Sequence, residues 1–207
     1  ERGPYTLENV TRCLERAKNN NMVPQHSLIK EIWQLILQAR GKMAENIVGY
    51  MNCCYEEGHV QERWQTSEAA QLDKSNGKSG PKAKRLINML CPIGKMVFSI
   101  IWQQAQIKKR PFAYGFHKGR RREQAILIQN VTTWKLREYD RLRGTKGEGN
   151  HITTLRDVAN AFPSPTHASL NETVDRAGLS KKAAEYMKQR HLSSKMIIKS
   201  GRRVVHN

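Results

Sequence analysis

Long apolar runs, paired cysteines and acidic residues are scarce in this sequence, and each shortage narrows what the protein can be. No stretch approaches the roughly 20 consecutive apolar residues that a membrane-spanning helix needs, so we expect no membrane partner. Four cysteines are present, but there is no Cys-x-x-Cys and no histidine at zinc-finger spacing, which excludes the common structural zinc sites. Cys53 and Cys54 lie in a helical pattern and are predicted to be buried thiols. We also expect no signal peptide. Together these features indicate a reducing intracellular setting, cytoplasmic, nuclear or both.

The shortage of acidic residues leaves a large positive charge. There are 36 Lys+Arg residues against 18 Asp+Glu residues, which gives a formal net charge of +18. Phosphates attract such an excess, and binding releases counterions, so the composition favours a nucleic-acid partner. Charge alone does not separate this class from basic ribosomal-type proteins, or from proteins whose charge only keeps them soluble.

The common catalytic motifs are also missing. Gly77-Lys78-Ser79 has the ending of a phosphate-binding P-loop, but Leu72 stands where the first glycine of that motif must be. There is no His-Glu-x-x-His and no Gly-x-Ser-x-Gly, so neither a metalloprotease nor an α/β-hydrolase is indicated.

Hydrophobic spacing predicts helices through most of the chain. Apolar residues share one face over 25–36 and again over 47–55, where Gly58 is a plausible C-cap. Pro92 suits the first turn of the next helix. Residues 1–24 are polar and weakly patterned. Later helices are predicted from about Glu123, with Ile128, Val131 and Trp134 pointing inward, and over 168–178 and 180–190.

Strand-like segments lie between and after these helices. Residues 69–72 predict a short strand, followed by a flexible basic loop over 73–81 and an apolar segment over 85–90. A polar turn over 144–150 precedes a predicted strand over 151–158. Residues 196–198 and 204–205 are predicted to pair as a hairpin. Helices followed by mixed elements predict an α+β fold.

Two segments have the residue types of a nucleic-acid or metal site. Residues 108–122 interleave seven cations with three rings, and cations neutralise phosphates while rings stack on unpaired bases. A solvated loop anchored by its rings has the same composition. Asp157 ends a predicted strand, where a carboxylate can hold a divalent metal near a phosphate. Most aspartates in turns instead accept hydrogen bonds from backbone N–H groups.

Three segments in order show a family pattern. The first is Gly58–Trp64 with Lys74, Arg85-Leu86-Ile87 and Lys95; the second is Tyr114–Arg120 with Ala125-Ile126; the third is Asp157–Phe162. In this order and spacing, over about residues 58–170, the chain resembles the reverse transcriptases of non-LTR (LINE-type) retrotransposons. The resemblance implies an incomplete right-hand polymerase fold. Its expected parts are a helical N-terminal segment (1–57), fingers (58–150) and a partial palm truncated before the second catalytic motif (151–207).

The resemblance also implies roles for the residues of the third segment. Asp157 matches the first carboxylate of a site for two Mg²⁺ ions, and the backbone carbonyl of Val158 joins it. Phe162 matches the ring that packs under the incoming sugar and disfavours a 2′-hydroxyl. Asn160 and Ala161 lie beside that ring and are expected in the nucleotide site.

In the fingers, the resemblance implies that Lys74 and Arg85 hold the triphosphate of an incoming deoxynucleotide. A set of residues is expected along the template path: Tyr114, Gly115, Phe116, Lys118, Arg120, Arg121 and Arg122. The expected partners are an RNA template, a DNA primer and deoxynucleotide triphosphates.

The sequence departs from the family pattern at Gln61, Leu86, His117 and Pro163, and in the basic Arg156 beside Asp157. Two-metal phosphoryl transfer needs at least a second carboxylate. The other aspartates, Asp73, Asp140 and Asp175, lie in no aromatic-x-Asp-Asp setting, so we expect no polymerase activity from this chain by itself. The alternatives are a non-catalytic basic RNA- or DNA-binding domain derived from a retroelement, and a helical protein whose charge serves solubility.

Overall fold

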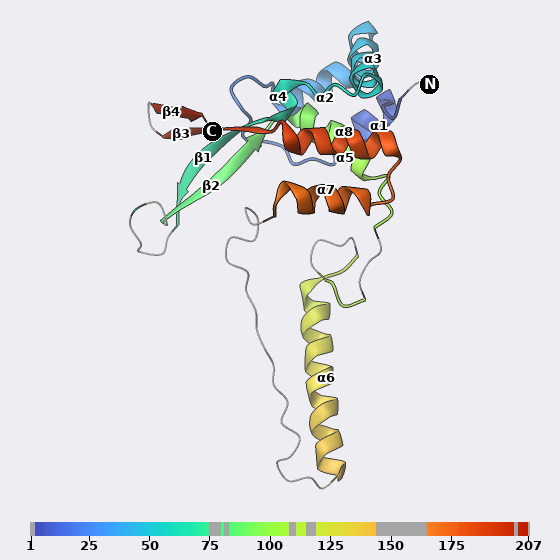
Figure 1. Ribbon diagram of the computed structural model, residues 1–207, viewed down its shortest axis with the longest axis vertical. Coiled ribbons are helices and arrows are strands. Elements are labelled where there is room, and N and C mark those ends of the chain that lie inside the picture. Colours follow the sequence, from blue (N-terminus) through green and yellow to red (C-terminus); the bar gives the residue numbers. More distant parts are fainter. Residues whose placement is uncertain are drawn as a thin grey trace. The chain divides into compact units, whose positions relative to one another are not determined.

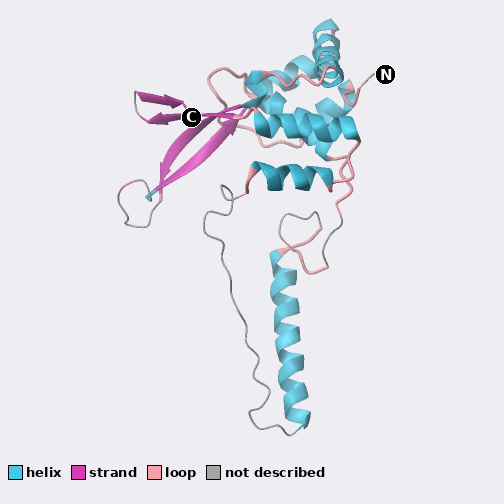
Figure 2. Cartoon of the chain, in the orientation of Figure 1, coloured by secondary structure: helices cyan, strands magenta, loops and turns pink. Residues whose placement is uncertain are grey.

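The computed structural model describes residues 3–74, 80, 83–107, 111–114, 119–143, 165–200 and 203–206. By their contacts these residues divide into two units. The first comprises Glu1–Gln106 and Pro165–Asn207, and the second comprises Ile107–Ser164. Helices and strands are both present (Figures 1 and 2), so the predicted α+β class is confirmed at that level.

The first unit begins with a group of helices: α1 (Leu7–Glu15), α2 (Lys30–Gln38), α3 (Lys42–Glu56) and the short α4 (Glu62–Gln65). Helix α1 begins in a segment where the sequence predicted no element. A reciprocal capping box defines its start, because the Asn9 backbone N–H donates to Thr6 Oγ1 (3.2 Å) and the Thr6 N–H donates to Asn9 Oδ1 (3.0 Å). Val10 and Leu14 are its buried residues. At the end of α3, Gly58 has φ +66°, which confirms its place as a C-terminal cap.

Helices α5 (Pro92–Trp102), α7 (His167–Asp175) and α8 (Lys181–Leu192) complete this group. Pro92 lies in the first turn of α5, as predicted. Helix α5 is deeply buried, and its Val97 and Ile101 have no exposed surface. The ring of Phe98 stacks on that of Tyr186 from α8, with 5.7 Å between centroids. The core therefore joins helices from both ends of the sequence.

A four-stranded sheet lies beside the helices, in the strand order β2-β1-β3-β4. Strands β1 (Thr66–Asp73) and β2 (Lys84–Leu90) form a long antiparallel hairpin. Strand β3 (Lys195–Ser200) runs parallel to β1, and β4 (Arg203–His206) returns along β3. Ile198 pairs with Val205, which confirms the predicted hairpin near the end of the sequence.

The second unit contains α6 (Arg122–Arg143), the helix predicted from about Glu123. Its described residues bury none of their side chains. Ile128, Val131 and Trp134 are exposed, so the prediction that they point inward is wrong for the described part of the unit. Apolar spacing indicated an amphipathic helix, but it does not supply the surface that would cover that face.

Two further predictions from the sequence meet different outcomes. Cys54 is buried, whereas Cys53 is exposed, because adjacent residues of a helix point about 100° apart and only one faces the core. The predicted turn over 144–150 and strand over 151–158 lie outside the described residues. Across the part of the chain that the structure describes, no helix is long and apolar enough to cross a membrane.

Candidate nucleic-acid interface

The β1–β2 hairpin brings together two cations that are distant in sequence. Leu72 lies opposite Arg85 and Asp73 lies opposite Lys84. The ladder continues one step further, because the Lys74 N–H donates to the Ala83 carbonyl oxygen at 2.7 Å. Residues directly opposite each other share a face of an antiparallel pair, and alternate residues on one strand do too. Lys74 and Arg85 are therefore diagonal neighbours on the face that also bears Leu72.

The two faces of the hairpin bear different sets of charged residues. On the face opposite Lys74, Lys84 Nζ lies 2.5 Å from Asp73 Oδ1. That ion pair offsets the charge of Lys84. The strand positions on the other face, from Leu72 to Lys74 and at Arg85, include no carboxylate. The face that bears Leu72 therefore brings two cations, Lys74 and Arg85, together.

This face continues into a cavity of about 710 Å³ in the first unit. Hairpin residues Ala70, Leu72, Ile87 and Met89 line it on one side, and α5 and the segment around the end of α1 line it on the others. Four cations belong to its lining, namely Arg16, Lys18, Lys30 and Lys95. Among the described residues, no carboxylate lines it.

Lys30 positions the segment that bears two of these cations. Its side chain is only 5% exposed, and its ammonium donates to the Ala17 carbonyl oxygen and to Asn19 Oδ1, each at 2.5 Å. A buried ammonium needs such acceptors, because desolvation without them is costly. The contacts hold residues 17–19 against the start of α2. Arg16 and Lys18 are thereby kept at the rim of the cavity.

A buried carboxylate in β1, that of Glu68, also helps to hold the segment before α2 in place. It accepts a hydrogen bond from the Gln25 N–H at 3.2 Å, and its Oε1 lies 3.7 Å from His26 Nδ1. The segment before α2 is in this way fastened to the hairpin. Glu68 thus has a structural role and does not belong to the lining of the cavity.

The arrangement suits a ligand that has both anionic and apolar parts. Leu72 and Ile87 are about half exposed on the floor, and the cations stand around them. In nucleic-acid complexes, phosphates pair with cations while bases and sugars rest on apolar or aromatic surfaces. The family pattern in the sequence contained Lys95, but it did not contain Arg16, Lys18 or Lys30. The only hint of those three in the sequence was the run of basic and amide residues over 16–30.

In the second unit, the predicted template-path residues have different surroundings. Arg120 Nη1 donates to the carbonyl oxygens of Pro111 (2.9 Å) and Ala113 (2.6 Å), and its guanidinium lies 5.6 Å from the centre of the Tyr114 ring. Arg120 therefore helps to fix the loop before α6. Arg121 and Arg122 are exposed at the start of α6. Gly115, Phe116 and Lys118 lie outside the described residues.

The predicted metal and sugar-selecting residues, Asp157, Val158, Asn160, Ala161 and Phe162, also lie outside the described residues. Across the residues that the structure does describe, no group of three or more His, Cys, Asp or Glu side chains is placed to hold a metal ion. The Mg²⁺ site remains an expectation of the resemblance.

Comparison with known proteins adds no assignment. No protein-family model matches the sequence, and no curated protein is significantly similar to it.

Proposed function

We propose that this chain is the fingers and first palm segment of an RNA-directed DNA polymerase of the non-LTR reverse-transcriptase type. Lys74 and Arg85 contact phosphates, either of an incoming deoxynucleotide triphosphate or of the template strand. The partners are an RNA template, a DNA primer and deoxynucleotide triphosphates, and Mg²⁺ acts with Asp157 in the complete catalytic site. A single aspartate cannot balance two metal ions, so substrate binding is the activity to measure on this chain.

The observation that supports the proposal most strongly is the shared face of Lys74 and Arg85. The family resemblance assigned both residues to the triphosphate from their motifs alone. The register of β1 and β2 makes them neighbours, although a loop separates them in the sequence. Two cations on one face, next to a cavity that Arg16, Lys18 and Lys95 also line, match the charge of a polyphosphate or a nucleic-acid strand.

A non-catalytic RNA- or DNA-binding domain is the second candidate. The apolar floor formed by Leu72 and Ile87 favours it, because a strand with bases and sugars covers such a floor better than a triphosphate does. The two candidates differ in what competes for the hairpin. If the hairpin binds nucleotides, free deoxynucleotide triphosphate should displace the labelled nucleic acid from it. If the hairpin binds a nucleic-acid strand, the free triphosphate should compete only weakly, as any anion does.

The test measures the binding of a fluorescein-labelled RNA template annealed to a DNA primer, by anisotropy across a series of salt concentrations. Lys74→Ala and Arg85→Ala are each expected to weaken binding by about 1 kcal/mol, which is roughly fivefold in Kd. Each should also reduce the slope of log K against log salt by about 1, because one phosphate contact is lost.

Lys84→Ala is the matched control, since it removes a cation from the opposite face of the same hairpin, where Asp73 is its partner. It should leave both the affinity and the salt slope close to those of the parent. Equal losses in all three variants would contradict the assignment of the face. Competition by deoxynucleotide triphosphate, lost in Lys74→Ala, would distinguish the polymerase from the non-catalytic domain.

A further inference from the structure

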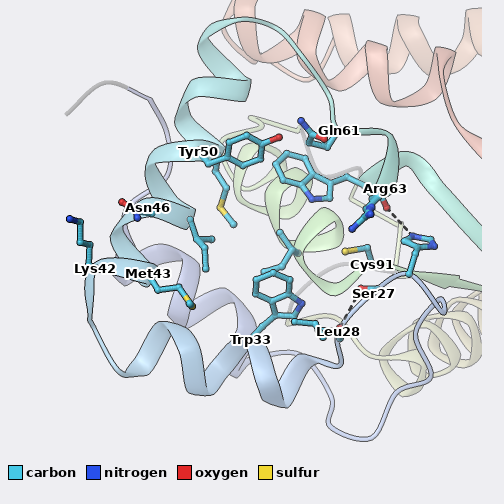
Figure 3. Close-up of a pocket in the computed structure, with 15 residues that line it drawn as sticks. Ser27, Leu28, Trp33, Lys42, Met43, Asn46, Tyr50, Gln61, Arg63 and Cys91 are labelled. Atoms are coloured by element: carbon cyan, nitrogen blue, oxygen red, sulfur yellow. Dashed lines mark hydrogen bonds between the residues drawn. The ribbon is translucent and has the colours of Figure 1, made fainter.

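A second cavity, of about 980 Å³, lies in the first unit (Figure 3). Its walls come from α2, α3 and α4, from the segment before α2 and from the start of α5. Its volume is in the range of pockets that hold a small ligand or part of a larger one. The sequence motif Gly58–Trp64 contributes Gln61, Arg63 and Trp64 to its lining, although the motif gave these residues no binding role.

Three aromatic rings line this pocket, those of Trp33, Tyr50 and Trp64. The Tyr50 and Trp64 rings meet edge to face, with 6.3 Å between centroids and 74° between planes. Trp64 is almost completely buried, whereas Tyr50 is 50% exposed. The buried indole supports one edge of the phenol ring, and the exposed part of Tyr50 offers an aromatic surface to a ligand.

Polar side chains around the rings are cationic or neutral. In Figure 3, Lys42 and Arg63 lie on opposite sides of the pocket, with Asn46 on the side of Lys42, and Gln61 also lines it. Among the described residues, the lining contains no carboxylate. The site is therefore complementary to a ligand that combines an aromatic group, amide-like hydrogen-bonding edges and negative charge.

We propose that this pocket binds an unpaired base of single-stranded nucleic acid. The base stacks on Tyr50, its edge faces the amide of Asn46, and the flanking phosphates pair with Lys42 and Arg63. The inference rests on the proposed nucleic-acid function and adds a contact specific for single strands. Duplexed bases cannot stack on a side chain in this way, so the pocket distinguishes single strands from duplexes.

A protein partner is the alternative ligand for this pocket. Leu28, just before α2, and Ile32 and Leu35 within it expose an apolar stripe that would suit an amphipathic helix. The lining itself favours the polyanion, because its charged residues are all basic and the whole chain has a net charge of +18. A strand of RNA supplies both the ring and the charge that the lining requires.

The experiment measures anisotropy of fluorescein-labelled oligouridylate of about 12 nucleotides, a length within the range that single-strand sites cover, and of the same strand annealed to its complement. Tyr50→Ala should weaken single-strand binding at least about fivefold and leave duplex binding unchanged, because one stacked base is lost. Tyr50→Phe keeps the ring and should keep the affinity. Lys42→Ala and Arg63→Ala should lower the salt slope for the single strand.

Two controls match these variants. Leu35→Ala removes an exposed apolar side chain of α2 outside the pocket, and Lys181→Ala removes an exposed cation at the start of α8. Neither should change the preference for single strands. The thermal unfolding midpoint of each variant shows whether Tyr50→Ala still folds; if it does not, the comparison of Tyr50→Phe with Lys42→Ala and Arg63→Ala decides.

The outcomes separate this inference from the proposed function. If Lys74→Ala and Arg85→Ala weaken binding while all pocket variants bind like the parent, the pocket assignment is wrong and the proposed function stands. If neither set has an effect, both are wrong. Binding of an acidic amphipathic peptide that is lost in Tyr50→Ala, with oligouridylate binding unchanged, would overturn the inference in favour of a protein partner.

Discussion

Gly94 and Trp64 bring two helices into backbone contact. A β carbon built on Gly94 would lie 2.8 Å from the Trp64 α carbon, 2.8 Å from its β carbon and 3.0 Å from its carbonyl oxygen. Real side chains do not approach that closely, so α5 and α4 pack at this distance only because residue 94 is glycine. Trp64 lines the aromatic pocket and directly precedes the β1–β2 hairpin. The small size of Gly94 thus helps to position α4, which contributes Trp64 to the aromatic pocket and leads into β1.

Gly94→Ala is therefore expected to destabilise the protein, although alanine is the better helix former. The added methyl group meets backbone atoms that cannot rotate away, and such overpacking costs about 1–3 kcal/mol. Gly49→Ala in α3 is the matched control, since nothing lies within 4 Å of a β carbon built there. That change should stabilise the protein by about 0.5–1 kcal/mol through helix propensity alone. Urea denaturation measures both; similar midpoints for the two variants would contradict the close approach.

Cys53 is expected to be exposed yet slow to react. Its thiol donates to Glu57 Oε1 at 3.2 Å, and this hydrogen bond, together with the negative charge of Glu57, raises the pKa of Cys53. Only the thiolate attacks disulfide reagents, so Glu57→Gln should lower the pKa and speed labelling near neutral pH. The measurement is the labelling rate with a chromogenic disulfide as a function of pH.

Glu56→Gln is the control for this change, because it removes a neighbouring carboxylate whose partner is Lys182. The buried Cys54 and Cys91 should label only when the structure opens, at the same rate in every variant. A labelling rate for Cys53 that Glu57→Gln leaves unchanged would show that the hydrogen bond does not form in solution.

The sequence predicted those elements whose signals are local. Gly58 ends α3 through its positive φ, and Pro92 begins α5, because each residue imposes its backbone conformation without help from distant contacts. Helix α1 was missed because its capping box uses Asn9 where Glu or Gln is the usual signal, and because its short apolar face is clear only once Val10 and Leu14 are buried.

The sequence failed to predict the first residues of β1, because these residues are held in the sheet by pairing with a distant part of the chain. Strand β1 was predicted over 69–72 but begins at Thr66, since its first residues pair with β3. Ser67 Oγ donates to the Lys195 carbonyl oxygen at 3.3 Å, a contact between residues 128 positions apart. Thr66, Ser67 and Glu68 are polar but buried, and nothing in their spacing signals a strand.

In the candidate sites too, local sequence motifs predicted some residues, whereas others come together only through long-range packing. Motif matching selected Lys74 and Arg85, and strand alternation then places them on one face. The rest of the cationic cavity needs α1 and the segment held by Lys30, which pack against the hairpin from a part of the chain without recognisable motifs. In the aromatic pocket, Trp33 was indistinguishable in sequence from an ordinary core residue, because a buried ring and a ring that lines a cavity have the same helical spacing.

The last prediction concerns pH and begins with His191. Burial, followed by the positive charges of Arg190 and His167, lowers the pKa of His191 below its ordinary value of about 6.5. Between the lowered value and 6.5, the unfolded chain binds a proton that the folded protein does not. The free energy of unfolding should therefore be unaffected by His191 above that window and should fall as the pH is lowered through it.

His191→Gln removes this contribution, so the free energy of unfolding should depend less on pH below 6.5 than it does in the parent. Arg190→Met should also flatten the curve in part, because one of the charges that disfavour protonation of His191 is gone. Urea denaturation at a series of pH values measures how steeply the free energy of unfolding depends on pH in each variant. Arg190→Met also removes the contact of Arg190 with the Phe98 ring, but that loss lowers the free energy of unfolding equally at every pH and leaves the slope unchanged. If the curves of the parent and His191→Gln run parallel through the window, the buried, electropositive surroundings of His191 do not govern its protonation.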